Sequence, residues 1–300
     1  MPYKLADLPQ AERLDELFQE LQADHSRGSR ELSALLLEEL LLWSLEIDQI
    51  TSEQIKNLCL KLTDLRPEMA AIANCGYLLW DRFQEKYDTG STLPVFREVL
   101  RNLRTEEEET DLQLVEHARK ASLDDADVMT FSRSSTVLML VNELESIKKT
   151  VVLHSYPGEE GIDTAEDLTE NTDVTFAYDM EAGYFLPRVD ALYLGVDTLL
   201  HDGSIVNKLG SRLLARSAVD TPVRVVTDIY KYTPVDKISI NPRYPSPGEL
   251  AESLQRNHPI FESIPARLID TYLTNKGCFS NPQSLSRTIS GLKRAHERLA

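Results

Sequence analysis

The sequence predicts an α/β protein with an N-terminal all-helical domain and a C-terminal doubly wound parallel sheet. Up to about residue 120, apolar side chains recur at helical spacing. After Asp125, short and nearly continuous apolar runs alternate with stretches of helical periodicity. That alternation is typical of a parallel sheet that is covered on both faces. We therefore expect a helical domain over residues 1–122 and a Rossmann-like domain over residues 123–300.

Four stretches in the first part of the chain predict helices. They are the segment with Leu14, Leu17, Phe18 and Leu21 at helical spacing, the Leu-rich segment Glu31–Ile50, the segment Met69–Tyr87, and the segment Val95–Leu103. The Leu-rich segment must be largely buried among other helices. The acidic tract Glu106–Glu109 is most simply a solvated helix start or face, and a binding tail is the weaker interpretation.

Five apolar runs in the second part predict strands. They are Asp127–Phe131, Thr150–His154, Val174–Tyr178, Val189–Gly195 and Pro222–Thr227. The stretch Thr136–Ile147 between the first two has helical periodicity, and right-handed crossovers would then give the doubly wound order. From Pro242 the chain contains several prolines, and a helix with basic residues is expected at Leu292–Ala300.

The net charge of −17 is unevenly distributed along the chain. Residues 1–125 hold 14 Lys and Arg against 26 Asp and Glu, whereas residues 126–300 hold 18 against 23. Such an acidic surface disfavours binding to phosphate backbones, so no direct nucleic-acid partner is expected. A salt-rich cytoplasm would also select an acidic surface, although the uneven distribution weakens that as a complete explanation.

Several features favour a cytoplasmic protein with no membrane partner. No apolar run approaches the roughly 18 residues that span a bilayer. The first residues show neither a signal-peptide core nor an Arg-rich amphipathic pattern. Cys59, Cys75 and Cys278 are odd in number and far apart, so they give neither a disulfide framework nor a paired metal site.

Binding or catalytic residues are expected in the loops beyond the carboxyl ends of the strands, because ligands of such sheets bind there. The first loop is Thr130–Ser135, which leads into a helix. Its hydroxyls and free N–H groups could hold a phosphate, with Arg133 adding charge, or Ser132 or Ser134 could simply cap the helix. The second loop, Ser155–Gly161, is most simply a turn.

Two further loops carry ionisable residues. Asp197 follows an apolar strand, where burial in a cleft would raise the pKa of its carboxyl, although an ordinary turn or cap is the alternative. Asn207 and Lys208 are expected to open the next helix and to reach a phosphate or hydroxyls. Lys231 lies a few residues beyond the last predicted strand.

Other familiar site patterns are absent from the sequence. There is no GxGxxG motif after the first strand, no phosphate-binding GxxxxGK[ST] loop, no HExxH and no GxSxG elbow. The six histidines show no metal-ligand spacing. The sequence therefore predicts no metal and no cofactor.

At these loops the sequence resembles the alpha, beta and delta subunits of translation initiation factor 2B and their isomerase relatives. The residues that carry the resemblance are Asp190–Ala215, Val128–Leu138, Val151–Leu168 and His258–Gly277, with weaker similarity in His25–Leu40 and Leu65–Asn74. The relatives are methylthioribose-1-phosphate isomerase and archaeal ribose-1,5-bisphosphate isomerase. The resemblance covers most of the chain.

The resemblance implies a fold, an assembly and a site. The fold is a helical domain on a Rossmann-like domain, assembled as homodimers or dimer-based hexamers, with other translation-factor subunits as further possible partners. In the isomerases a cysteine and an aspartate exchange protons with a sugar phosphate, and Asp197 matches that aspartate. The positions that match sugar or phosphate contacts are Arg27, Gly28, Ser134, Ser135, Asn207 and Lys208, with Arg66 and Lys231 as looser matches.

Departures from the family pattern bear on activity. Ser132 stands where the isomerases have the catalytic cysteine, and Tyr156 stands where members often have an arginine. A serine hydroxyl is a far poorer proton donor or acceptor at neutral pH than a thiol. We therefore expect an initiation factor 2B-like protein that binds a phosphorylated sugar or nucleotide without catalysis. The alternatives are an active aldose–ketose isomerase and a purely structural partner whose acidic half docks on a basic protein.

Overall fold

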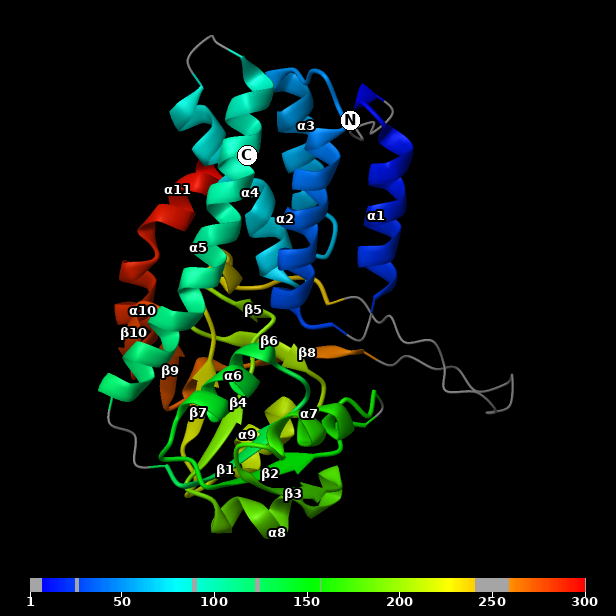
Figure 1. Cartoon of the computed structure of the whole chain (residues 1–300). Coiled ribbons are helices and arrows are strands. Elements are labelled where there is room, and N and C mark those ends of the chain that lie inside the picture. Colours follow the sequence, from blue (N-terminus) through cyan, green and yellow to red (C-terminus); the bar gives the residue numbers. More distant parts are fainter. Residues whose placement is uncertain are drawn as a thin grey trace, which may run out of the picture.

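The computed structural model describes residues 7–24, 27–87, 91–121, 125–156, 158–240 and 259–299 of the chain. Figure 1 shows a bundle of helices stacked on a layer of strands and helices, with α5 running from the bundle down to the sheet. The expected domain boundary at residues 122 and 123 lies outside the described residues, as do His25, His258 and the proline-containing stretch from Pro242 to Pro247.

The first part of the chain is helical, as predicted. Its helices are α1 (Ala11–Ala23), α2 (Ser29–Leu45), α3 (Ser52–Thr63), α4 (Ala70–Lys86) and α5 (Thr92–Lys120). Thr51 begins α3 with a capping box, in which its hydroxyl accepts from the Gln54 amide and its own amide donates to the Gln54 side chain. Among the described residues no helix is both long and apolar enough to span a bilayer.

The Leu-rich segment is buried along one helix face. Leu32, Leu36, Leu40 and Trp43 of α2 are fully buried, because their spacing of about one helical turn places them on a single stripe. The helix ends at Leu45, earlier than the predicted Ile50. Leu45 itself is exposed, which agrees with its position outside that stripe.

The acidic tract Glu106–Glu109 lies in the middle of α5, so it is not a helix start, but Glu108 and Glu109 are exposed as expected of a solvated helix face. The helix continues because this part of it packs on its neighbours. Glu106 forms a two-pronged ion pair with Arg82 of α4, at 2.6 and 3.0 Å. Glu107 is buried and accepts the hydroxyl of Ser33 at 2.6 Å.

The second part contains a seven-stranded sheet. Its strands are β1 (Asp127–Phe131), β2 (Lys149–Leu153), β3 (Asp173–Ala177), β4 (Ala191–Leu194), β7 (Val223–Val226), β9 (Thr271–Thr274) and β10 (Gly277–Phe279). The order is β3-β2-β1-β4-β7-β9-β10, and all neighbours pair in parallel except β9 and β10. All five predicted strands are present, and the strand order reverses between β1 and β4, which is the switch point of a doubly wound sheet.

Both faces of the sheet are covered. Successive residues of β1, Val128 and Met129, belong to two different apolar clusters because a strand alternates its side chains between the faces. One cluster joins the sheet to α6 (Ser135–Glu143), α7 (Gly161–Leu168) and the end of α5. The other joins it to α8 (Ala182–Phe185) and α9 (Ser211–Ser217), with the short 3-10 turns η2 (Asp179–Glu181) and η3 (Leu186–Arg188) leading to β4.

A second, three-stranded antiparallel sheet was not predicted. It consists of β5 (Thr198–Leu199), β6 (Ile205–Lys208) and β8 (Phe261–Ile264), paired in the order β5-β6-β8. Asn207 and Lys208 therefore end a buried strand, and the expectation that they open a helix was wrong. They pair with Glu262 and Phe261 of β8, a strand more than 50 residues further along the chain, which local periodicity could not reveal.

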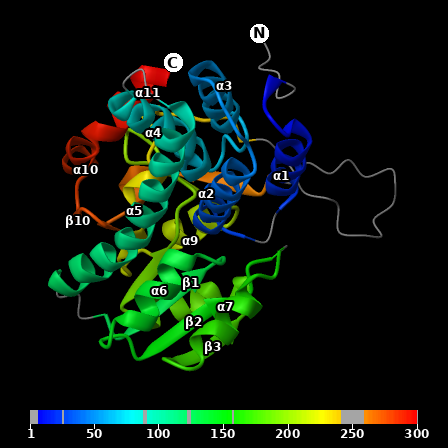
Figure 2. The ribbon, with the colours of Figure 1, turned by 45° about the horizontal axis from the view of Figure 1, so that its top comes forward.

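The end of the chain returns to the helical part. After η5 (Ala266–Leu268), β9 and β10, helices α10 (Pro282–Thr288) and α11 (Ser290–Leu299) run back along the bundle (Figure 2). Helix α11 packs on α4, where His296 stacks on Tyr77 with ring centroids 3.7 Å apart. His296 also hydrogen-bonds the Asn74 side chain at 2.7 Å. The first and last helical segments of the chain thus share one bundle.

Candidate functional site

A cleft opens beyond the carboxyl ends of β1 and β4, between the sheet and the start of α2. It has two adjoining chambers that share Gly28, Ser132, Arg133 and Asp197. The Lys208 chamber encloses about 460 Å³, and its other lining residues include Arg27, Arg66, Met69, Glu160 and Lys208. The Lys231 chamber encloses about 320 Å³, and its other lining residues include Ser29, Arg30, Ser134, Ser135, Asn207 and Lys231. Both volumes include open solvent.

The structure brings all the sequence-predicted site residues to this cleft. They are Arg27, Gly28, Arg66, Ser132, Arg133, Ser134, Ser135, Asp197, Asn207, Lys208 and Lys231. Three lining residues that sequence reasoning missed are Ser29, Arg30 and Glu160. Glu160 lies in the loop that was expected to be a simple turn, so only its proximity in the fold reveals it.

The loop after β1 is strained at Ser132. This residue has a φ of 67°, in the left-handed region that side chains other than glycine rarely adopt. Its amide donates to the Ser155 hydroxyl at 2.7 Å, and its own hydroxyl donates to Glu160 Oε1 at 2.9 Å. Ser134 caps α6 by accepting from the Val137 amide. The capping interpretation therefore holds for Ser134, while the Ser132 hydroxyl faces the cleft.

The loop after β2 carries Glu160 to the cleft. Ser155 has a φ of 68°, and the Asp179 carboxylate accepts from the amides of Ser155 and Tyr156, each at 2.8 Å. Gly161 begins α7 where an added Cβ would collide with the Leu153 carbonyl, so a side chain there would push the helix start away. The Tyr156 side chain is 59% exposed and does not line either chamber.

Asp197 lies between β4 and β5, and its side chain is not the N-cap of any helix that the structure describes. Its amide donates to Val206 O at 2.9 Å and its carbonyl accepts from the Ala70 amide at 3.2 Å, which ties it to both β6 and α4. Burial raises the pKa of its carboxyl to about 6, and nearby Lys231, Ser29 and Arg66 oppose that rise. The pKa of the Asp197 carboxyl therefore lies closer to neutral pH than that of an exposed aspartate.

Lys231 is a buried cation of the cleft. It ends the 3-10 turn η4 (Ile229–Lys231), and its ammonium donates to the Thr136 hydroxyl at 3.3 Å. Burial lowers the pKa of Lys231, while the nearby carboxylates of Asp228 and Asp197 raise it. Asp228 is itself held by Arg30, at 3.1 Å.

The other basic residues of the cleft are held by carboxylates. Lys208 contacts both carboxylate oxygens of Glu160. The remaining pairs are Arg27 with Asp24 at 2.5 Å and Glu20 at 2.8 Å, Arg66 with Glu68 at 2.8 Å, and Arg133 with Asp167 at 2.5 Å. Arg66 also donates to the backbone carbonyls of Leu21 and Asp24 at the end of α1, so it fixes that region as well as lining the chamber.

Two helix N-termini converge on the Lys231 chamber. Gly28 and Ser29 begin α2, and Ser134 and Ser135 begin α6. Free backbone N–H groups and the helix dipole favour an anion at such ends. The Ser29 hydroxyl is buried without a hydrogen-bond partner at bonding geometry among the described residues. The Gly28 amide already donates to Glu31 Oε2 at 3.2 Å, and Ser29 lowers the pKa of the nearby Asp197 carboxyl. An anionic ligand would therefore accept from the other N–H groups at these helix ends.

The cysteines lie away from the cleft. Cys59 and Cys75 are buried in the helical part and Cys278 is in β10. Burial raises the pKa of Cys75 well above its ordinary value, which keeps it a neutral thiol. Among the described residues no group of three or more His, Cys, Asp or Glu side chains is placed to hold a metal ion.

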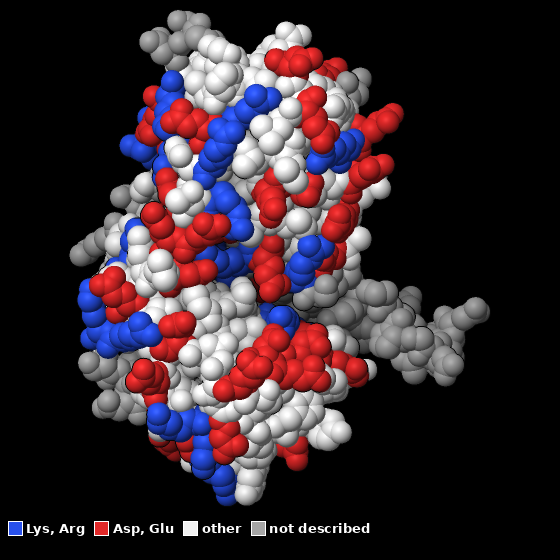
Figure 3. Space-filling model, viewed as in Figure 1, with Lys and Arg blue, Asp and Glu red and all other residues white. Residues whose placement is uncertain are grey.

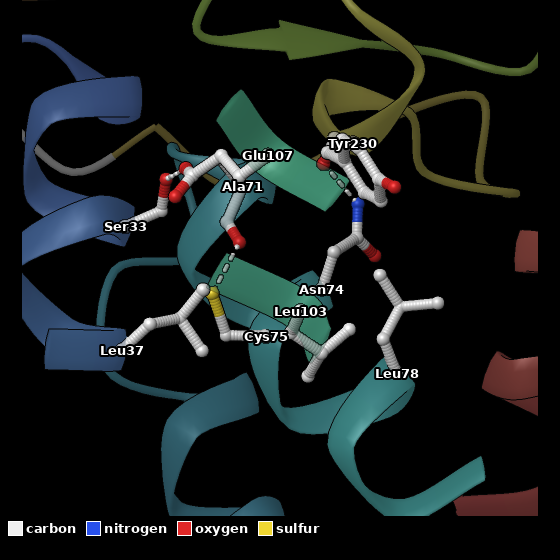
Figure 4. A pocket seen from close by; sticks show the side chains of 9 residues that line it. All are labelled: Ser33, Leu37, Ala71, Asn74, Cys75, Leu78, Leu103, Glu107 and Tyr230. Carbon is white, nitrogen blue, oxygen red and sulfur yellow. Dashed lines mark hydrogen bonds between the residues drawn. The ribbon is translucent and has the colours of Figure 1, made fainter. Parts of the chain in front are cut away.

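A separate cavity of about 300 Å³ lies within the helical part (Figure 4). Figure 4 shows Leu37, Cys75, Leu78 and Leu103 around it, with Glu107 at one side. Its lining is mostly apolar, and burial raises the pKa of Glu107. Arg30, a lining residue of the cleft, contacts the Glu107 carbonyl and the Asp228 carboxylate and so lies between the cavity and the cleft.

The surface around the cleft is acidic. In Figure 3 acidic side chains gather where α7 lies, and Asp163, Glu166 and Asp167 are exposed on that helix. The same view shows mixed charges over the helical bundle. The exposed charge over α7 is thus negative, whereas Lys208 and Lys231 of the cleft are buried.

Comparison with known proteins agrees with the fold and the resemblance. A family model described as "Initiation factor 2 subunit family" matches residues 13–281. A Pyrococcus abyssi protein named as eIF-2B subunit 2-like is 28% identical over 235 residues, covering 75% of this chain and 82% of that protein. A ribose 1,5-bisphosphate isomerase of Thermococcus kodakarensis is 23% identical over 246 residues, covering 75% and 76%.

Solved structures show the same fold. The Pyrococcus horikoshii translation initiation factor eIF-2B aligns with a TM-score of 0.77 at 21% identity, covering 92% of this chain and 99% of that one. The beta2-delta2 eIF2B tetramer of C. thermophilum gives 0.73 at 17%, covering 96% and 97%. The 5-methylthioribose 1-phosphate isomerase of P. horikoshii gives 0.73 at 18%, covering 94% and 87%. The structural neighbours therefore include both factor subunits and an isomerase.

Proposed function

The chain belongs to the initiation factor 2 subunit family, and on that premise we propose that it binds a phosphorylated sugar or a nucleotide in the cleft without converting it. One observation carries the proposal. Two helix N-termini, the buried Lys231 and the buried Ser29 hydroxyl meet at the switch point of the sheet. Together these groups supply the hydrogen-bond donors and the positive charge that a bound phosphate requires.

In the proposed complex the phosphate lies in the Lys231 chamber. It accepts from backbone amides at the starts of α2 and α6 and from Lys231. Sugar hydroxyls then reach the carboxylate of Asp197 and the side-chain amide of Asn207, which line the same chamber. Asn207 is buried at the end of β6 and donates to Ser211 at 3.0 Å, so it is held in place before any ligand arrives.

Ser132 supports the proposal that the ligand is bound and not converted. Its hydroxyl donates to Glu160, and no histidine among the described residues lines the cleft to accept its proton. An ordinary thiol titrates near pH 8.5, whereas an alkyl hydroxyl stays protonated throughout the physiological range. Loss of one proton-transferring group typically slows a reaction by about 10²–10⁴-fold.

A second candidate is an aldose–ketose isomerase that acts on a pentose phosphate. The observation that favours it is the Asp197 carboxyl, whose pKa of about 6 suits proton exchange at neutral pH. The hydrogen bond from Ser132 to Glu160 would give a second acid–base pair in place of a thiol. Detection of a ketose product would favour this candidate over simple binding.

We also propose that the protein assembles with a second copy of itself or with related subunits. The edge strand β3 and the turn after it expose Phe176, Tyr178 and Met180, and Tyr184 of α8 is exposed nearby in sequence. Met180 is 94% exposed, which is unusual for a large apolar side chain. A role in translation initiation is part of this proposal, because it would act through such subunits. Light scattering of the purified protein tests the homodimer, and a strict monomer would contradict it.

The ligand proposal is tested by thermal shift and mass spectrometry with ribose 1,5-bisphosphate, ribose 5-phosphate, methylthioribose 1-phosphate and AMP. A ligand at about 100 times its Kd should stabilise the fold by roughly 2.7 kcal/mol. The Lys231→Met variant should lose that shift, whereas the exposed Lys237→Met variant should keep it. Absence of any shift with these ligands at millimolar concentration would contradict the proposal.

A further inference from the structure

The two lysines of the cleft, Lys208 and Lys231, differ in the groups to which their ammonium ions donate. Lys208 is buried and contacts both oxygens of the Glu160 carboxylate. Lys231 is also buried, but its ammonium has a hydroxyl partner, Thr136, and no described carboxylate within ion-pair distance. An ammonium has three donors, of which Glu160 takes two on Lys208. Lys231 therefore has no direct ion pair among the described residues, although Asp228 and Asp197 act on its charge from further away, whereas Lys208 is directly neutralised. Lys231 is thus the lysine more available to an anion.

Glu160 differs from the other carboxylates that neutralise cations of the Lys208 chamber. Arg27, Arg66 and Arg133 are held by carboxylates that do not line the chamber, whereas Glu160 itself forms part of the wall. A ligand in this chamber would meet both the Glu160 carboxylate and the Lys208 ammonium that it neutralises.

The local fold holds Glu160 in that place. It directly precedes α7, and its carbonyl accepts from the Thr164 amide at 3.1 Å and from the Thr164 hydroxyl at 2.9 Å. Its carboxylate accepts from the Ser132 hydroxyl at 2.9 Å as well as from Lys208. Gly158 packs over the pair so closely that an added Cβ would lie 2.7 Å from the Lys208 nitrogen. The ion pair is thus enclosed by its own loop and is not a chance surface contact.

We propose that Glu160 is a specificity-determining residue that limits the cleft to ligands with a single phosphate. The inference rests on the proposed function, in which that phosphate occupies the Lys231 chamber. The uncharged, hydroxyl-bearing end of the ligand then faces Glu160 and Lys208, where a carboxylate accepts from hydroxyls and the third ammonium donor remains free. A second phosphate at that end would face the Glu160 charge and displace it from Lys208, so bisphosphates are disfavoured.

Calorimetric titration of the full chain with ribose 5-phosphate and with ribose 1,5-bisphosphate tests the assignment. The wild-type protein should bind the monophosphate at least as tightly as the bisphosphate. The Glu160→Gln variant should bind the bisphosphate about 10-fold more tightly than wild type, with the monophosphate affinity changed by less than about threefold. The matched control is Glu159→Gln, because Glu159 is exposed in the same loop and lines neither chamber. It should leave both affinities unchanged.

The outcomes separate this inference from the proposed function. A wild-type protein that prefers the bisphosphate by about 10-fold, or a Glu160→Gln variant that shifts both affinities equally, overturns the specificity role while the binding function stands. If neither compound binds the wild-type protein at millimolar concentration, the proposed function and this inference both fail. The wild-type preference needs no variant, so the test holds even if Glu160→Gln does not fold.

Discussion

Ser132 and Ser155 are both left-handed residues at the ends of neighbouring strands, and the Ser132 amide donates to the Ser155 hydroxyl at 2.7 Å. The Ser155 hydroxyl also donates to the Leu153 carbonyl at 3.0 Å. One buried side chain thus connects the loop after β2 to the loop after β1. Because strained residues persist only where their surroundings fix them, this bond determines how the cleft is shaped.

Replacing Ser155 with alanine should loosen both loops. The Ser132 amide would lose its partner, which costs about 1–3 kcal/mol for a buried polar group. We expect the unfolding midpoint to fall by several degrees, measured by thermal denaturation. The control is Ser217→Ala, which removes the hydroxyl of an exposed residue at the end of α9. It should change the free energy of unfolding by less than about 0.5 kcal/mol. Equal stability of the two variants would contradict the structural role of Ser155.

Replacing Gly161 with alanine should displace the start of α7. The added Cβ would collide with the Leu153 carbonyl, and such overpacking costs about 1–3 kcal/mol or more. Gly183 offers a matched control within a helix, since an added Cβ there meets nothing within 4 Å. Chemical denaturation should show a clear loss for Gly161→Ala and little change for Gly183→Ala. A reversed order would show that the β2–α7 junction is more open than described.

The Asp197→Asn variant should change how stability depends on pH. In the folded protein burial raises the pKa of Asp197 to about 6 from the ordinary 3.8, so the native state holds this proton more tightly than the unfolded chain. That contribution is present at low pH and is lost as the pH rises towards and through 6. Between pH 5 and pH 8 wild type should lose about 1 kcal/mol relative to the variant. Urea unfolding at both pH values measures this, and parallel profiles would contradict it.

His296 should give a pH effect of the opposite sign. Burial lowers its pKa to about 4 from 6.5, so the unfolded chain binds this proton more tightly than the native state. Stability that is present at pH 7 is therefore lost as the pH falls through 6.5 towards 4. Relative to a His296→Gln variant, wild type should lose about 1–2 kcal/mol between pH 7 and pH 5. Urea unfolding of both proteins tests it, and an unchanged difference at the two pH values would contradict it.

Much of the fold could be predicted from sequence because its signals are local. The apolar run Asp127–Phe131 is β1, and Leu32, Leu36 and Leu40 repeat at one helical turn and are buried on α2. Apolar burial drives both elements, and its period differs between strands and helices. The acidic tract was compatible with a helix start or a solvated face, because acidic residues are favoured at both places. Its position in the middle of α5 depends on packing such as the Glu106–Arg82 ion pair.

For the candidate site, too, local signals could be predicted from the sequence and long-range contacts could not. The sequence by itself predicted the residues of the cleft that follow strands, because the carboxyl ends of parallel strands meet at one edge and the polar residues there were recognisable. Arg27, Gly28 and Arg66, which lie in the helical part, were expected only from the family resemblance. Only the tertiary structure decided that Lys208 ends a strand of a second sheet and that Glu160 neutralises it, while Lys231 remains available. Both features arise from contacts between residues that are far apart in the chain. The net charge of the site depends on which cations and carboxylates these contacts pair, and the sequence does not show that pairing.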